Sequence, residues 1–411
     1  MTVQMSQSQV DELLAEANPG PTDTNRVTMR KRDVAIFFSI VLSVYAAING
    51  YVFVHGFSAI EEFPDLKPLY VALFVFLSFS FLAGRILERR GFFVFGGTLV
   101  WIGSFWLAAM VYFLLVAVSL DLALLLDQLI HVLPGPETLI RLKHFTFVFA
   151  TGAVTLVVAG GHLNAIHPVI TPLELHIRKN TGGLKRLQVV VASDIHLGTI
   201  VCRSRLEHIV SAINRLQPDL VLLPGDVVDE DLGPVIEQNL GETLRKIQSK
   251  FGVIAVTGNH EYIGGVEAAC GYLRDHGITV LRDSTIKIAD SLYVVGREDL
   301  SFARSTGKRR KTLPELLAGV DKELPLILMD HQPFRLNEAE ENGIDLQLSG
   351  HTHHGQLWPF NFITKKVYEL SRGYMKKGNT HVYVSCGVGT WGPPVRTGNR
   401  PEIVHLQLSF A

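Results

Sequence analysis

Residues 187–196 read LQVVVASDIH, a run over residues 187–192 that is apolar except for Gln188 and leads into a serine, an aspartate, an isoleucine and a histidine. An apolar run without alternation is typical of a strand that is buried on both faces of a sheet. Asp194 and His196 are two positions apart, and side chains at this spacing point the same way in extended backbone. A carboxylate and an imidazole at the end of this strand can therefore reach one metal ion. A single pair of this kind also arises by chance.

The same pattern follows four more predicted strands, which cover residues 219–223, 251–256, 325–329 and 345–348. A helix is predicted over residues 203–216, before the first of these four. The polar residues just beyond the four strands are Asp226 and Asp229, Asn259 and His260, His331, and His351 and His353. In open α/β sheets, ligands bind beyond the carboxyl ends of the strands. Five such endings in succession favour one shared site over five unrelated turns.

The chemistry of these candidates narrows the kind of metal. They offer oxygen and imidazole nitrogen but no thiolate, which suits Mn, Fe, Zn, Ni or Co better than a structural zinc site. The chain has three cysteines, and their odd number and wide spacing match neither a disulfide framework nor a zinc knuckle. Gly225 and Gly258 precede two of the candidate groups, and glycine suits turns in which the backbone comes close to a ligand.

Together these segments resemble the five motifs of the calcineurin-like metallophosphoesterase family, from about residue 187 to the end of the chain. The resemblance implies an α/β domain built as a four-layer α-β-β-α sandwich. The tail over residues 387–402 further resembles the bacterial membrane-associated branch, which often carries N-terminal hydrophobic segments. That branch has a glycine where this chain has His354, for which a rim group and an additional phosphate contact are both open.

The resemblance also implies roles for the candidate residues. One divalent ion would take Asp194, His196, Asp226 and His353, and a second would take Asp226, Asn259, His331 and His351. Asp226 would bridge the pair, because two dications about 3.5–4 Å apart need a shared anion between them. A hydroxide held between the ions would be the nucleophile, with its pKa lowered by their charge.

Three further residues of these motifs are given supporting roles. In the family pattern, His260 donates a proton to the leaving oxygen. Asp229 is expected to orient His260 or one of the ligands. Glu261 is predicted to be a capping or surface residue and not a ligand.

The N-terminal part of the chain has a different composition. Four stretches are apolar on all sides and long enough to cross a bilayer, namely residues 34–54, 68–84, 92–120 and 145–165, with an interfacial extension predicted over 121–133. The first stretch follows a polar tail and lacks a small-x-small cleavage site, so it is not expected to be a signal peptide. The predicted organisation is a polar tail (1–33), a transmembrane region (34–170) and a phosphoesterase domain (175–411).

Basic residues near the predicted spans indicate the orientation. They are Arg26, Arg30, Lys31 and Arg32, then Arg85, Arg89 and Arg90, and finally Arg178, Lys179, Lys185 and Arg186. Because Lys and Arg stay in the cytoplasm, a multi-pass cell-membrane protein with a cytoplasmic catalytic domain is predicted. Few polar residues occur within the spans, among them Asn49 and His162, which gives a transport role little support. The net charge of −1 provides no basic field for a nucleic acid partner.

The sequence therefore predicts a membrane-anchored, metal-dependent phosphoric ester hydrolase with two divalent ions. Phosphomonoesters and phosphodiesters both fit, and a membrane anchor favours a lipid-linked or nucleotide-linked substrate at the bilayer surface. The rival interpretation is a non-catalytic metal-binding scaffold or sensor module. A scaffold is expected to show gaps in the ligand set, and the predicted set has no gap.

Overall fold

The computed structural model describes residues 31–131 and 136–411 of the chain. They form two units, each with its own core. The helical unit contains residues 31–163 together with Gly392–Thr397, and the α/β unit contains Asn164–Trp391 and Gly398–Ala411. Most of the predicted polar tail, including Arg26 and Arg30, lies outside the described residues.

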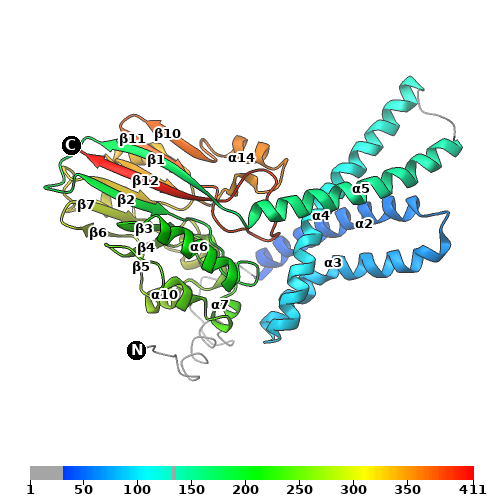
Figure 1. Cartoon of the computed structure of the whole chain (residues 1–411), viewed down its shortest axis with the longest axis horizontal. Coiled ribbons are helices and arrows are strands. Elements are labelled where there is room, and N and C mark those ends of the chain that lie inside the picture. The colour runs from blue at the N-terminus through cyan, green and yellow to red at the C-terminus, as the bar shows by residue number, and fades with distance from the viewer. Residues whose placement is uncertain (1–30, 132–135) are drawn as a thin grey trace. The chain divides into compact units, whose positions relative to one another are not determined.

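Four long helices make up the helical unit, and each is apolar and long enough to span a membrane (Figure 1). They are α2 (Lys31–Ala59), α3 (Lys67–Arg89), α4 (Phe93–Ile130) and α5 (Pro136–Ala165), with a short 3₁₀ turn η1 (Pro64–Leu66) before α3. The four candidate spans agree with the four predicted from the sequence. Helix α4 runs without a break through the predicted interfacial extension as far as Ile130.

Helices α3 and α4 pack closely because glycines lie between them. A Cβ atom on Gly84 would come within 2.6 Å of the backbone nitrogen of Val100, so no larger residue fits there. The buried side chain of Asn49 on α2 joins this pair, since its Oδ1 accepts from Ser78 at 2.9 Å and from Trp106 at 3.0 Å. Asn49 thus connects three helices.

The α/β unit contains two six-stranded sheets. The first has the order β1-β12-β2-β3-β4-β5, with β1 (Val169–Ile177), β2 (Arg186–Val191), β3 (Leu220–Pro224), β4 (Val253–Val256), β5 (Ile278–Leu281) and β12 (Glu402–Phe410). The second has the order β10-β11-β9-β8-β7-β6, with β6 (Ser284–Ile288), β7 (Leu292–Gly296), β8 (Leu326–Met329), β9 (Leu346–Ser349), β10 (Gly373–Lys377) and β11 (Thr380–Val384).

Pairing within each sheet sets the direction of the central strands. Strands β2, β3, β4 and β5 are parallel to one another, and so are β7, β8, β9 and β11. Within each set, the carboxyl ends of the strands therefore meet at one edge of the sheet. Strands β12, β6 and β10 run antiparallel to their neighbours β2, β7 and β11.

Helices cover the outer faces of the two sheets. The first sheet packs against α6 (Arg203–Arg215), α8 (Leu240–Leu244) and α10 (Val266–Asp275), and the second against α12 (Leu313–Leu316) and α13 (Asn337–Glu341). Figure 1 shows α6 and α10 lying along the first sheet. The remaining helices are α7 (Gly233–Glu237), α9 (Asn259–Gly264), α11 (Ser301–Thr306), α14 (Asn361–Val367) and the 3₁₀ turn η2 (His353–Gly355).

The apolar runs of the sequence fill both faces of these strands. On β2, Leu187, Val189 and Val191 face the second sheet, where they pack with Ile327 and Met329 of β8. Val190 faces the helices on the other side. Because both faces are buried, a continuous apolar run is favoured over an alternating one. The predicted four-layer α-β-β-α sandwich is confirmed.

Candidate metal centre

The predicted site residues follow five strands that belong to two different sheets. Asp194 and His196 come after β2, Asp226 and Asp229 after β3, Asn259 and His260 after β4, His331 after β8, and His351 and His353 after β9. The structure brings all nine together: there are three groups of potential ligands, two of which share His196, and Asn259 contacts the third. The carboxyl ends of strands from both sheets thus meet at one buried cluster of side chains.

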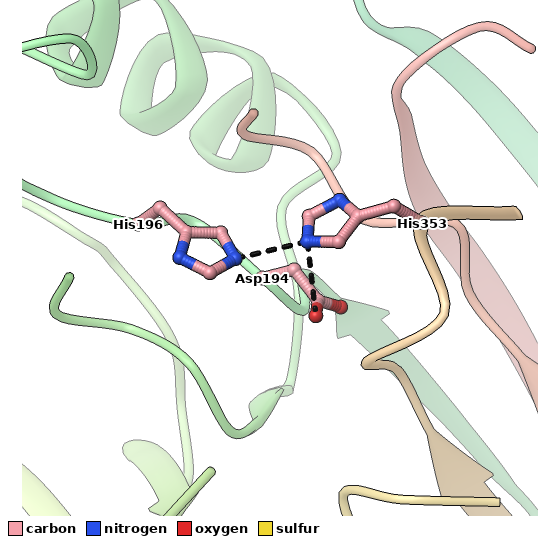
Figure 2. A group of neighbouring side chains, drawn as sticks. All are labelled: Asp194, His196 and His353. Carbon is pink, nitrogen blue, oxygen red and sulfur yellow. Dashed lines mark hydrogen bonds and ion pairs between the residues drawn. The ribbon is translucent and has the colours of Figure 1, made fainter. Parts of the chain in front are cut away.

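Asp194, His196 and His353 form the first group (Figure 2). Their ligand atoms lie within 4.8 Å of one another, and the Nε2 atoms of His196 and His353 are 2.9 Å apart. Asp194 Oδ1 lies 3.7 Å from His353 Nε2. Its other oxygen, Oδ2, is buried without a hydrogen-bond partner among the described residues. Two converging imidazoles and a buried carboxylate fit the donor set of a divalent cation.

Asp226, His331 and His351 form a second group together with Asn259. His331 Nε2 lies 3.1 Å from Asp226 Oδ2 and 3.3 Å from Asn259 Oδ1. His351 Nδ1 lies 2.7 Å from the same amide oxygen. His331 Nδ1 is 2.7 Å from the carbonyl oxygen of Pro224, which can only accept, so this nitrogen donates. When His331 is neutral, its Nε2 lone pair therefore points into the group, as a metal ligand requires.

Asp226 belongs to the second group and also contacts the first. Its Oδ2 is 3.1 Å from His331 Nε2 and 3.8 Å from His196 Nε2. Burial would raise the pKa of Asp226, but the charge and hydrogen bond of His331 and the charges of His260 and His196 hold it below its ordinary value. The carboxylate thus stays charged within reach of both groups, where the predicted pair of ions would need a shared anion.

Backbone conformation sets this site apart from ordinary turns. Five of the predicted ligands have φ angles in the left-handed region, namely Asp194 (52°), His196 (54°), Asp226 (51°), His351 (70°) and His353 (43°). Each such residue costs on the order of 1–3 kcal/mol and persists only where surrounding contacts hold it. Two contacts of this kind are His260 N–H to Asp226 Oδ1 at 2.9 Å and His351 N–H to Asp194 Oδ1 at 2.8 Å.

Two glycines allow the ligand turns to approach each other. Gly225 has a φ angle of 87°, and a Cβ there would come within 2.5 Å of His331 Nδ1. A Cβ on Gly258 would overlap Asp226 Oδ1. Both positions therefore need glycine because a ligand side chain occupies the space of its Cβ.

Asp229 joins two of the imidazoles. Its Oδ1 lies 3.0 Å from His260 Nδ1 and 3.4 Å from His196 Nδ1. Burial would raise the pKa of Asp229, but these two close contacts and the charges of both histidines hold it well below its usual value. Burial lowers the pKa of His260, but the bond to Asp229 and the charges of Asp226 and Asp229 outweigh it and raise the pKa to about 9. The neighbouring carboxylates therefore favour the protonated form of His260.

Glu261 is a cap, which is one of the two alternatives predicted from the sequence. Its side chain is fully buried. Its carboxylate accepts from the backbone N–H groups of Gly258 at 2.7 Å, Val228 at 2.9 Å and Asp226 at 3.2 Å. Burial and the charge of Asp226 raise its pKa to about 7. The side chain thus connects the turn after β3 to the turn after β4, at the third position of α9 where capping glutamates occur.

A buried ion-pair network behind His331 was not predicted from the sequence. Asp330 pairs with Arg297 at 3.2 Å and with Arg310 at 2.7 Å. These partners lie far from Asp330 along the chain, so no local spacing indicates them. The network holds the turn that carries His331.

His354, the residue that departs from the bacterial pattern, is buried beside the ligand turn. Its Nδ1 lies 3.0 Å from Ser371 Oγ. Burial and the charges of Arg372 and Lys365 lower the pKa of His354. It is therefore a neutral side chain packed against Ser371.

Comparison with known proteins agrees with this geometry. Residues 187–355 match the model of the calcineurin-like phosphoesterase family. A metallophosphoesterase of Aquifex aeolicus is 34% identical over 225 residues, which cover 54% of this chain and 85% of that protein. A Danio rerio transmembrane protein with a metallophosphoesterase domain is 34% identical over 264 residues, which cover 61% of this chain and 60% of that protein.

A metallophosphoesterase of Helicobacter pylori is 34% identical over 226 residues, or 54% of this chain. The chain spans about 60% of the length of the Helicobacter and Danio proteins. Since relatives occur in bacteria and in animals, membership of a bacterial branch stays a prediction. The motifs after five strands, their convergence at one site and the match over 85% of the Aquifex protein lead to one conclusion: the chain belongs to the calcineurin-like metallophosphoesterase family.

Proposed function

We propose that the α/β unit hydrolyses phosphoric esters with two bound divalent cations. The observation that carries this proposal is the convergence of a complete set of oxygen and imidazole donors from five strand ends on one buried site. A scaffold that has lost its chemistry would be expected to lack one or more of these donors. The complete set therefore supports catalysis over a metal-binding scaffold or sensor.

The proposed ligands divide between the two ions. One ion would be held by Asp194, His196, Asp226 and His353, and the other by Asp226, Asn259, His331 and His351. The buried Oδ2 of Asp194 and the Nε2 lone pair of neutral His331 support this assignment. When bound, the ions would supply the hydroxide nucleophile and positive charge against the phosphoryl oxygens. Mn, Fe, Zn, Ni and Co all suit these donors.

His260 is proposed to hold the proton that the leaving oxygen receives. Its Nδ1 lies 3.0 Å from Asp229 Oδ1, an ion-pair distance, and Nε2 is proposed as the atom that carries and releases the proton. Asp229 is proposed to position His260, and the same oxygen also faces His196. A single carboxylate would thus orient the proton donor and one ligand.

The proposed substrate is a lipid-linked phosphoester at the cytoplasmic surface of the membrane, and a nucleotide-linked ester is the second candidate. The four candidate spans support this choice, because they would confine the site to the vicinity of a bilayer. The Danio relative is also named as a transmembrane protein, which supports the anchor.

The test uses the purified full-length chain after loading with Mn. We expect two metal ions per chain and turnover on at least one member of a panel of lipid and nucleotide phosphoesters. Two bound ions without turnover on any ester would favour the scaffold. Asp226→Ala should lose at least one ion and nearly all activity, because it removes the bridge. A variant that keeps two ions and full turnover would contradict the assignment.

A further inference from the structure

The apolar side chains that the α/β unit exposes are concentrated in one short segment. Residues 358–367 hold five of the eleven large apolar side chains that are exposed between residues 164 and 411. The five are Trp358, Phe360, Phe362, Ile363 and Val367, with exposed fractions from 39% to 58%. Exposed apolar residues that occur singly are normal, but a cluster of this kind marks an interaction surface.

This segment has a defined backbone. Helix α14, drawn in orange in Figure 1, covers Asn361–Val367, and Phe362 N–H donates to the carbonyl of Pro359 at 3.0 Å. Gly355 packs so tightly against it that a Cβ there would overlap the carbonyl carbon of Phe360. No residue of α14 is buried. The backbone is therefore fixed on the unit while its apolar side chains point to the outside.

Charge accompanies the apolar residues. Lys365 and Lys366 lie within α14, both are exposed, and neither forms an ion pair with any residue in the part of the chain that the structure describes. Aromatic and aliphatic residues next to unpaired lysines are typical of an element that lies in the interface of an anionic bilayer. The acyl boundary takes up the apolar groups, and the lipid phosphates attract the lysines.

The same segment is connected to the metal centre. Turn η2, which carries the proposed ligand His353, directly precedes it. Gln356 bonds to both the N–H and the carbonyl of Trp391 at 3.0 Å, and the indole of Trp391 lies 5.8 Å from the ring of His260. Tyr368, just after α14, has its ring 6.2 Å from that of His351. Aromatic residues thus lie near two imidazoles of the centre, and both are connected to the exposed segment, Trp391 through Gln356 and Tyr368 through the chain.

We propose that residues 358–367 form a bilayer-docking platform that holds the metal centre close to an anionic membrane surface. The phosphate of a lipid could then reach the centre while its hydrocarbon chains stay in the membrane. This inference rests on the proposed hydrolysis of a lipid-linked ester. A second copy of the chain is the competing occupant of the same surface, and the test below separates the two.

Docking is tested directly with a label on full-length protein in vesicles of phosphatidylcholine and phosphatidylglycerol. Ile363→Cys, made in a Cys202→Ser background, carries an environment-sensitive fluorophore, and Lys322→Cys is the matched control at an exposed turn. The label at 363 should shift to the blue and be quenched by brominated phospholipid, more strongly with phosphatidylglycerol present. The label at 322 should remain in water. An unquenched label at 363 would overturn the proposal, and a blue shift that requires higher protein density would assign the surface to a second copy.

Activity provides the second measurement. We compare turnover on a bilayer-embedded phosphoester with turnover on a soluble p-nitrophenyl phosphoester. The double variant Phe362→Ser and Ile363→Ser should lower the ratio of the first rate to the second by about tenfold or more. A loss of this size corresponds to removing one large apolar group from an interface. An unchanged ratio would overturn the inference. The two failures are distinct: an inactive protein whose label at 363 is quenched disproves hydrolysis alone, whereas an active protein with an exposed label disproves docking alone.

Discussion

At the scale of single residues, His260 makes two contacts that can be separated by substitution. Its backbone N–H donates to Asp226 Oδ1 at 2.9 Å, while its imidazole pairs with Asp229 at 3.0 Å. Only the second contact belongs to the side chain. A change of side chain therefore removes the proposed proton donor and leaves the contact that supports the bridging carboxylate.

We predict that His260→Ala retains both metal ions and loses about 10²–10⁴-fold in turnover on an ester with a poor leaving group. An ester of p-nitrophenol should lose much less, because nitrophenolate leaves readily without a proton. Metal content and both rates are measured on one preparation. Equal losses on the two esters would contradict the role of His260 as a proton donor. Loss of metal would indicate instead that His260 binds a metal ion or supports a residue that does.

Gly258 provides a second prediction at this scale. Its missing Cβ leaves room for Asp226 Oδ1, so Gly258→Ala should displace the bridging carboxylate and lower metal affinity by about 10–100-fold. Gly271→Ala on α10 is the matched control, since a Cβ there meets nothing within 4 Å. Titration with Mn, followed by metal analysis and circular dichroism, distinguishes the two variants. Equal metal affinity in both would show that the turn adapts.

At the scale of elements, the five strands that precede the site could be predicted because they are mainly apolar and buried on both faces, although β9 also buries Gln347. The candidate ligands could be predicted too, because they directly follow the ends of these strands. The left-handed backbone of Asp194 or His353 could not be predicted, because it results from contacts between turns that are distant in sequence. For Glu261, local spacing predicts a cap, but the burial of its side chain depends on the neighbouring turn and cannot be predicted from spacing.

The cap leads to a prediction about stability. Glu261→Gln replaces one acceptor oxygen by an amide that faces a backbone N–H, so it should destabilise the unit by about 1–3 kcal/mol. For a unit of this size, the melting temperature should fall by roughly 2–12 °C. Glu267→Gln is the control, because the side chain of Glu267 is 79% exposed where it pairs with Arg282. It should cost less than about 1 kcal/mol.

Both variants are measured as full-length protein after removal of metal with a chelator, so that changes in metal binding do not contribute. A melting temperature that is unchanged in Glu261→Gln would mean that the three N–H groups find other acceptors. If the melting temperature of Glu267→Gln fell by a similar amount, the change in net charge would explain the effect.

At the scale of the whole molecule, composition alone separates the helical unit from the α/β unit. One segment from the C-terminal part of the sequence nevertheless belongs to the helical unit. Gly392–Thr397 comes late in the chain, yet it packs within the helical unit, where Arg396 N–H donates to the carbonyl of Gly161 at 2.9 Å and His162 Nδ1 to that of Pro394 at 2.8 Å. Its turn-rich sequence gives no sign of partners more than two hundred residues away.

The direction in which the helices cross the membrane is the last prediction. Arg85, Arg89 and Arg90 lie at the end of α3, whereas Glu61, Glu62 and Asp65 lie between α2 and α3. Because basic residues remain in the cytoplasm, the loop between α2 and α3 should be outside the cell and the α/β unit inside. Single cysteines at Asp65 and Lys246, both exposed, report on these two places.

In a Cys202→Ser background, a membrane-impermeant maleimide should label Asp65→Cys in intact cells and should label Lys246→Cys only after the cells are permeabilised. The two variants serve as controls for each other, because each must react under one of the two conditions. Rapid labelling of Lys246→Cys in intact cells, with Asp65→Cys protected, would reverse the orientation. The site would then act on substrates outside the cytoplasm, and the search for its lipid phosphoester would move to the outer face of the membrane.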